Sequence, residues 1–151
     1  MLNRRIGSEL VNVSYTPIFS KLAPASEPLK IISASHVTAE SGTGLVHCAP
    51  AHGAEDYNAF LSLGLISTSQ NIVCHVDKEG QFNRGVADVV GDDAAGKLVG
   101  RTVLTDGSRA VVELLREMSS LVKIQRIKHR YPYDWKTNEP IIVTSVVFLQ
   151  H

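Results

Sequence analysis

The sequence predicts an α+β fold with a mixed, β-rich, partly closed, barrel-like sheet and a few inserted helices. Short apolar runs rich in β-branched residues recur along the chain, as is typical of strands. Only two segments show the apolar spacing of an amphipathic helix. Strands and helices do not alternate regularly, which argues against a doubly wound sheet. A chain of 151 residues is long enough to bury a hydrophobic core.

Six segments are expected to form the strands of this sheet. Each combines apolar or β-branched residues with a nearby turn signal, such as the proline that follows the third. The expected strands are Leu10–Tyr15, Leu29–Ser33, Leu45–Cys48, Asn71–Val76, Leu121–Lys128 and Pro140–Leu149. Loops or turns are expected at Lys21–Pro28, Ser41–Gly44 and Lys78–Gly80.

Two segments are expected to form helices. From Gly53 to Leu63 the larger apolar residues fall at helical spacing, and Gly64 is suited to end the helix. Asp106 is placed to cap a second helix, whose apolar stripe follows an i, i+3, i+4, i+7 pattern. That stripe consists of Val111, Leu114, Leu115 and Met118.

Charge and cysteine content exclude several classes of function. Lysine plus arginine equals aspartate plus glutamate, so the chain is not expected to hold nucleic acid by bulk charge, although a local contact patch stays open. Two cysteines, Cys48 and Cys74, are too few for a disulfide scaffold and fit buried free thiols. No apolar run approaches the length of a membrane span, so no membrane partner is expected.

The stretch from Gly42 to Tyr57 carries the most chemical information. It combines a glycine-flanked turn, a short apolar run, a proline and a helix start, where free N–H groups can face a ligand. Asp56 is expected in or near the first helical turn, where it can present a carboxylate to a cationic group. His47 can donate or accept a hydrogen bond near pH 7. Each also has an ordinary structural interpretation, Asp56 as a helix-dipole partner and His47 as a core residue.

A metal site is the other chemistry that this stretch allows. His47, His52 and Asp56 lie close in sequence, and Cys48 and His75 are further possible ligands. The spacing does not match the familiar zinc patterns. We therefore expect no metal and no cofactor, and keep a metal-dependent hydrolase as a competing hypothesis.

The same stretch resembles the editing (connective peptide 1) domain of isoleucyl-tRNA synthetases. Its motif residues are more similar to those of the bacterial and mitochondrial branch of the family. Those domains carry Gly-Thr-Gly, a hydrophobic pair, a histidine, Ala-Pro and an aspartate nine residues after the histidine. His47 and Asp56 have this separation. The segments Ser35–Thr38 and His129–Pro140 are also similar to segments that flank the site in the family.

The resemblance implies post-transfer editing, the hydrolysis of valine wrongly attached to the isoleucine tRNA. It implies that Asp56 anchors the α-ammonium group of the substrate and that His47 lies beside the aminoacyl group. Water, positioned partly by the ribose hydroxyl of the substrate, is the expected attacker. Further substrate-binding residues are expected at Gly42, Thr43, Gly44 and His52.

The chain also departs from the family pattern. A threonine-rich strand that walls the pocket in the family is not found here, nor are the elements that bind ATP, so this chain is not expected to aminoacylate tRNA. We expect an editing domain over residues 1–143, incomplete at its N-terminal side and apparently a fragment, with a divergent tail at 144–151. The alternative is a non-catalytic fragment that only binds aminoacyl groups or tRNA ends.

The resemblance also implies the partners and the compartment. The expected partners are the aminoacylated 3′ end of tRNA and the remainder of the synthetase, the expected oligomeric state is a monomer, and the expected compartment is the cytoplasm or the mitochondrion. Four residues of the second flanking segment could contact tRNA or form a packed aromatic hinge. They are His129, Tyr131, Trp135 and Lys136.

Overall fold

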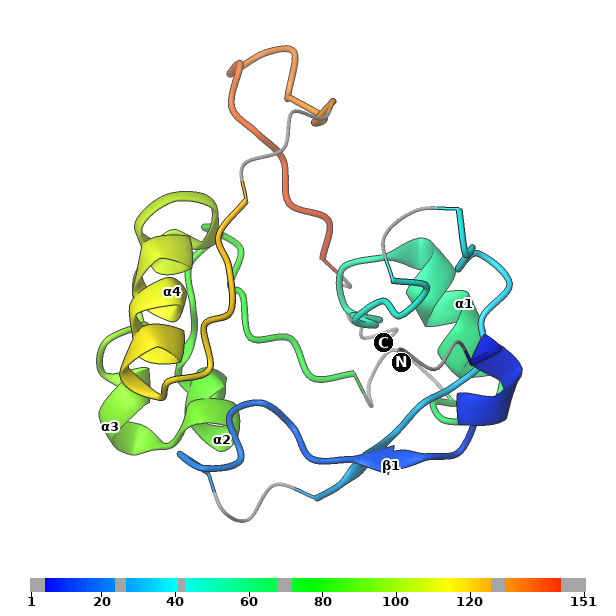
Figure 1. Ribbon diagram of the computed structural model, residues 1–151. Helices are drawn as coiled ribbons and strands as arrows, with labels where there is room; N and C mark the ends of the chain where they lie inside the picture. Colours follow the sequence, from blue (N-terminus) through cyan, green and yellow to red (C-terminus); the bar gives the residue numbers. More distant parts are fainter. Residues whose placement is uncertain (1–4, 24–26, 41–42, 68–71, 126–129, 145–151) are drawn as a thin grey trace. The chain divides into compact units, whose positions relative to one another are not determined.

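The computed structural model describes residues 5–23, 27–40, 43–67, 72–125 and 130–144. These residues divide into two compact units (Figure 1). The first unit takes in the described residues of 5–20 and 27–74, together with Thr144. The second takes in Lys21–Ala23 and the described residues of His75–Val143. The predicted division into residues 1–143 and a short tail stays a prediction.

The first unit contains a small antiparallel sheet and one longer helix. The helix η1 (Gly7–Leu10) precedes β1 (Ser14–Tyr15), which pairs with β2 (Leu29–Lys30). Two more backbone hydrogen bonds extend this pairing beyond the strands. The N–H of Asn12 donates to the carbonyl of Ile31, and the N–H of Ile31 donates to the carbonyl of Val13.

The helix α1 (Ala54–Ser62) confirms the first predicted helix. Gly53 is its N-cap, and Gly64 adopts a φ of 67° just beyond its end. The N–H of Leu65 donates to the carbonyl of Phe60 and that of Gly64 donates to Leu61, at 3.0 and 3.1 Å. This pair of bonds is the Schellman motif, which satisfies the last helical carbonyls and favours glycine at the left-handed position.

The named elements of the second unit are all helical. Its elements are η3 (Arg84–Val86), α2 (Ala87–Val90), α3 (Asp92–Ala95), the π-helical turn η4 (Val103–Gly107) and α4 (Ser108–Glu117). The predicted turn before them is present, since the N–H of Gly80 donates to the carbonyl of Asp77 and Gly80 has a φ of 74°. Most buried apolar side chains of the described residues belong to this unit, namely Val86, Val90, Ala94, Ala95, Leu98 and Leu114.

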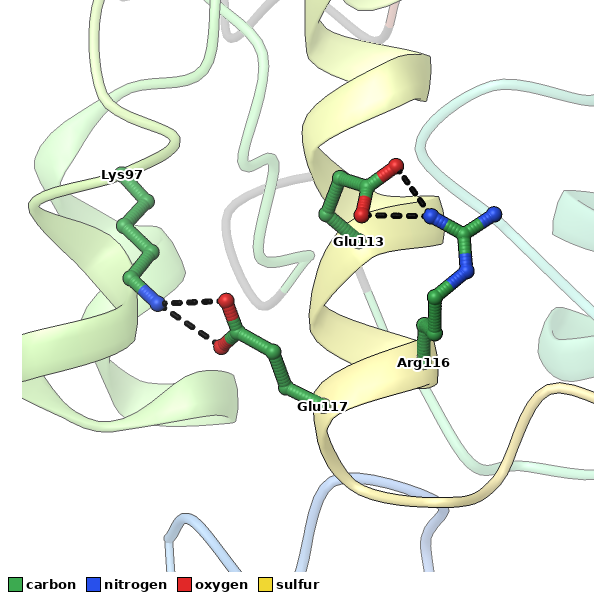
Figure 2. Close-up of polar contacts among 4 residues, drawn as sticks. All are labelled: Lys97, Glu113, Arg116 and Glu117. Atoms are coloured by element: carbon green, nitrogen blue, oxygen red, sulfur yellow. Dashed lines mark hydrogen bonds and ion pairs between the residues drawn. The ribbon is translucent and has the colours of Figure 1, made fainter.

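The helix α4 confirms the second predicted helix but not its predicted cap. Gly107 is the N-cap residue, and Asp106 instead accepts a hydrogen bond from the backbone N–H of Thr102 at 3.0 Å. Asp106 therefore closes the turn before the helix. On the exposed face of α4, Glu113 pairs with Arg116, and Glu117 accepts both of its hydrogen bonds from Lys97, as Figure 2 shows.

The predicted β-rich, barrel-like sheet is wrong. The named strands of the described residues form one open, two-stranded sheet, accompanied by four α-helices. The segments at Leu45–Cys48, 72–75 and 121–125 are irregular, and Val76 and Pro140 form only isolated bridges. Residues 71, 126–128 and 145–149 of the predicted strands lie outside the described residues.

The reason for this error is that β-branched residues favour extended backbone without supplying a partner strand. Val122 is 99% exposed and Val46 is 60% exposed, so these runs do not pack one face against a core as a half-buried strand would. Among the described helices, none is both long and apolar enough to cross a membrane.

Candidate functional site

Asp56 lies in the first turn of α1, as the sequence predicted, and its side chain is only 16% exposed. Its Oδ2 atom accepts a hydrogen bond from the backbone N–H of Ala49 at 2.8 Å. The carbonyl of Ala49 in turn accepts from the N–H groups of His52 and Gly53, at 2.8 and 3.1 Å. The Asp56 carboxylate therefore holds a tight loop over the N-terminus of its own helix, where a negative charge is favoured.

The second oxygen of this carboxylate is held by His36. The distance between His36 Nε2 and Asp56 Oδ1 is 2.9 Å, and the His36 side chain is 20% exposed. An ionised carboxylate only accepts hydrogen bonds, so His36 donates from Nε2. The role of His36 is not predictable from the sequence, because twenty residues separate it from Asp56 and no local spacing rule links them. The only available signal was its position in the flanking segment Ser35–Thr38.

Cys48 lies beside the same carboxylate. Burial, followed by the negative charge of Asp56 and a hydrogen bond to it, raises the pKa of the Cys48 thiol above its usual value of 9.0. The thiol therefore stays protonated near neutral pH. Because the thiolate is the nucleophilic form, Cys48 is poorly suited to attack an ester.

Three other predicted site residues belong to the glycine-containing turn that precedes this cluster in the sequence. Gly42 lies outside the described residues. The Thr43 hydroxyl lies 3.3 Å from both the N–H and the carbonyl of Leu45, and Gly44 has a φ of 74°, which suits glycine. The predicted glycine-containing turn is thus present where the structure describes it.

The two predicted histidines of this stretch differ in their surroundings. His47 is exposed, and within the described residues it shares no hydrogen bond with Asp56. His52 is half-buried, with its Nε2 atom 3.8 Å from Cys74 Sγ. The structure thus joins Asp56 to His36, Cys48 and the Ala49 loop, and the roles predicted for His47 and His52 stay predictions.

The metal hypothesis requires several ligands close together. Across the part of the chain that the structure describes, no three histidine, cysteine, aspartate or glutamate side chains gather closely enough to hold a metal ion. The observed cluster instead places one carboxylate beside His36, the Cys48 thiol and the N–H of Ala49.

The region Arg130–Pro140 contains a hydrogen-bonded turn. Asp134 accepts hydrogen bonds from the N–H of Lys136 and the hydroxyl of Thr137, and Trp135 at its tip is 86% exposed with the Lys136 ammonium over its ring. Tyr131 and Tyr133 pack edge to face. The aromatic residues therefore pack locally, while Trp135 faces solvent.

Comparison with known proteins gives the family. No family model matches the chain. The chain is 42% identical over 138 residues to the chloroplastic/mitochondrial isoleucine–tRNA ligase of Arabidopsis thaliana. The matched region covers 91% of this chain and 11% of that protein. It is 39% identical over 137 residues to isoleucine–tRNA ligase of Synechococcus, covering 90% and 12%. The corresponding protein of Corynebacterium diphtheriae is 34% identical over 146 residues, covering 97% and 12%.

The chain thus spans about one eighth of the length of these relatives. The similar proteins include both bacterial and organellar ones, as the residues of the motifs predicted. Over about nine tenths of its length, the chain is a homologue of one segment of the isoleucyl-tRNA synthetases.

Proposed function

We propose that this chain carries a post-transfer editing site, which hydrolyses the ester of valine wrongly attached to the isoleucine tRNA. The observation that carries the proposal is the geometry of Asp56. Its carboxylate is held at both oxygens, is mostly buried at the start of α1, and lies in a stretch that resembles the editing motif. Similarity to isoleucine–tRNA ligases over most of the chain supports the same assignment.

The chemical need for such a site follows from substrate size. A pocket that accepts isoleucine cannot strongly reject a side chain that is one methylene smaller, so a second pocket must remove the error. In this proposal, Asp56 binds the α-ammonium group of the misattached valine through a charge-assisted hydrogen bond. His47 lies beside the aminoacyl group, and Gly42, Thr43, Gly44 and His52 complete the binding site.

Water is the proposed nucleophile. The Cys48 thiol lies beside Asp56, and its raised pKa makes it a poor attacker. Asp56 acts as an anchor and not as a general base, since an ammonium partner makes a carboxylate a weaker proton acceptor. Catalysis then depends mainly on holding the ester and water in the right orientation.

The proposed partners follow from this chemistry. They are the aminoacylated 3′ end of tRNA and the remainder of a synthetase, in a cytoplasmic or mitochondrial setting that the bacterial and organellar relatives support. The chain is proposed to act as a monomer.

Deacylation of valyl-tRNA of the isoleucine type tests the proposal. The 151-residue chain is expected to release valine faster than the spontaneous rate, and Asp56→Asn is expected to slow the release by about tenfold or more, because it removes the charge that binds the ammonium. Asp88→Asn is the matched control, since Asp88 is an exposed first-turn aspartate of α2. Release no faster than the spontaneous rate by the unchanged chain would contradict a catalytic role.

A second candidate function is binding of aminoacyl groups or tRNA ends without turnover. It is favoured by the raised pKa of the Cys48 thiol, which leaves this neighbour of Asp56 unactivated. Binding of valyl-adenosine amide that weakens in Asp56→Ala, with no release of valine from tRNA, would favour this candidate. Equal affinity of the two proteins would exclude Asp56 as an ammonium anchor in both.

A further inference from the structure

Asp56 is held by two donors from separate segments of the first unit. His36 donates to Oδ1 over 2.9 Å, and the N–H of Ala49 donates to Oδ2 over 2.8 Å. We propose that His36 is the positioning residue that fixes the Asp56 carboxylate to receive an α-ammonium group. This inference rests on the proposed function, in which Asp56 binds that ammonium.

Donors on both oxygens fix the orientation of the carboxylate plane, which a donor on one oxygen alone would not do. The terminal torsion of an aspartate has a broad energy minimum, so one hydrogen bond leaves the carboxylate plane free to turn. The Ala49 bond comes from a loop only seven residues before Asp56, and it fixes one oxygen. The His36 bond comes from a segment twenty residues away and fixes the other oxygen, so the plane takes one orientation.

The carboxylate keeps hydrogen-bonding capacity for a cationic ligand. An ionised carboxylate offers about four lone-pair positions; His36 and the N–H of Ala49 use one on each oxygen, and the hydrogen bond of the Cys48 thiol uses a third. The side chain is 16% exposed, so part of it remains accessible to a ligand. A ligand ammonium that binds there meets few competing waters.

The type of donor also suits an ammonium partner. Imidazole in its neutral form donates one hydrogen bond without adding a positive charge. Lysine or arginine at position 36 would place a permanent positive charge on Oδ1, which would compete with the ligand. In its neutral form, a histidine at this position orders the carboxylate and leaves its negative charge for the substrate.

This role predicts that His36 acts on ligands only through their ammonium group. The probes are two adenosines that carry an acyl group in amide linkage on the ribose. One bears valine, and the other bears 3-methylbutanoate, which has the same carbon skeleton without the ammonium. A residue that merely stabilises the loop would affect both probes alike.

Titration of both probes against the full 151-residue chain is the test. His36→Leu is expected to weaken binding of the valyl probe by about tenfold and to change that of the 3-methylbutanoyl probe by less than about twofold. His36→Gln should restore the binding of the valyl probe, because its amide nitrogen can reach the position of Nε2. His36→Asn is the matched control, since its amide nitrogen corresponds to Nδ1 and it should behave as His36→Leu does.

The outcomes separate the inference from the proposed function. Equal weakening of both probes in the His36 variants would assign His36 a purely structural role and overturn the inference. If Asp56→Asn discriminates between the probes while His36→Leu and His36→Asn do not, only the inference fails. If Asp56→Asn does not discriminate, the proposed ammonium anchor itself fails. Should His36→Leu not fold, the comparison of Gln with Asn at this position decides the question.

Discussion

The two units of the chain are stabilised in different ways. Most buried apolar residues among those described lie in the second unit, around Leu98 and Leu114, whereas the first unit contributes only Ala51 and Ile66. The first unit is held instead by directional hydrogen bonds around Asp56. The candidate site therefore lies in the unit whose geometry depends on a few polar contacts.

This difference matters because the two kinds of interaction respond differently to change. Apolar packing tolerates the substitution of one apolar side chain by another of similar volume. A half-buried carboxylate that loses a hydrogen-bond donor is left with a desolvation free energy that no contact compensates. Conservative substitutions should then be mild in the second unit and harmful around Asp56. Three measurements test this difference between the units.

The largest effect is expected from Leu98→Ala. Leu98 is 1% exposed, and truncating a fully buried leucine lowers the free energy of unfolding by about 2–5 kcal/mol. Leu63→Ala is the control, because Leu63 is 48% exposed and its truncation should cost less than about 1 kcal/mol. Urea denaturation followed by circular dichroism measures both. Similar losses would show that packing in the second unit does not dominate.

An intermediate effect is expected in the reactivity of Cys48. The pKa of the Cys48 thiol is raised by burial and then by Asp56. The raised pKa therefore contributes to the stability of the folded chain, and this contribution is fully present at pH values below the pKa of the unfolded thiol. That contribution disappears as the pH rises through the folded pKa. At pH 8, alkylation of Cys48 by iodoacetamide should be slower in the folded chain than in urea.

Asp56→Asn sharpens this measurement. Removing the negative charge should speed the alkylation of folded Cys48, but by less than unfolding in urea does, since Asp56 is a smaller cause of the raised pKa than burial is. Mass spectrometry of the peptide that contains Cys48 gives the rate, with Cys74 as the internal comparison. An unchanged rate in Asp56→Asn would separate Cys48 from the carboxylate cluster.

The smallest effect is expected from Lys97→Gln. The Lys97 and Glu117 side chains of Figure 2 are 53% and 56% exposed. Exposed ion pairs contribute about 0–1 kcal/mol, so the midpoint of urea denaturation should barely move at physiological salt. A loss comparable to that of Leu98→Ala would mean that charge, and not apolar packing, holds α4 in place.

The helices could be predicted from sequence because their signals are local. Gly64 and the apolar spacing before it define the end of α1, and Asp56 falls in the first turn as expected. The stripe of α4 was also correct, although Asp106 closes the preceding turn and does not cap the helix.

The sheet and part of the site could not be predicted in this way. A strand exists only when another segment pairs with it, and apolar runs such as Leu45–Cys48 carry no information about a partner. The contact of His36 with Asp56 likewise depends on how the intervening twenty residues fold. What the sequence supplied for the site was the position of the carboxylate, and what the structure added was its second donor.

The short segment Lys21–Ala23 has a consequence for any attempt to divide this protein. It belongs to the second unit although the residues on both sides of it belong to the first. A side chain at Gly91 would place its Cβ atom 2.6 Å from the carbonyl oxygen of Leu22, so the backbones meet too closely there for any residue but glycine. Truncation at a single peptide bond therefore cannot release either unit whole, and the halves of a split protein would have to be designed around this crossing.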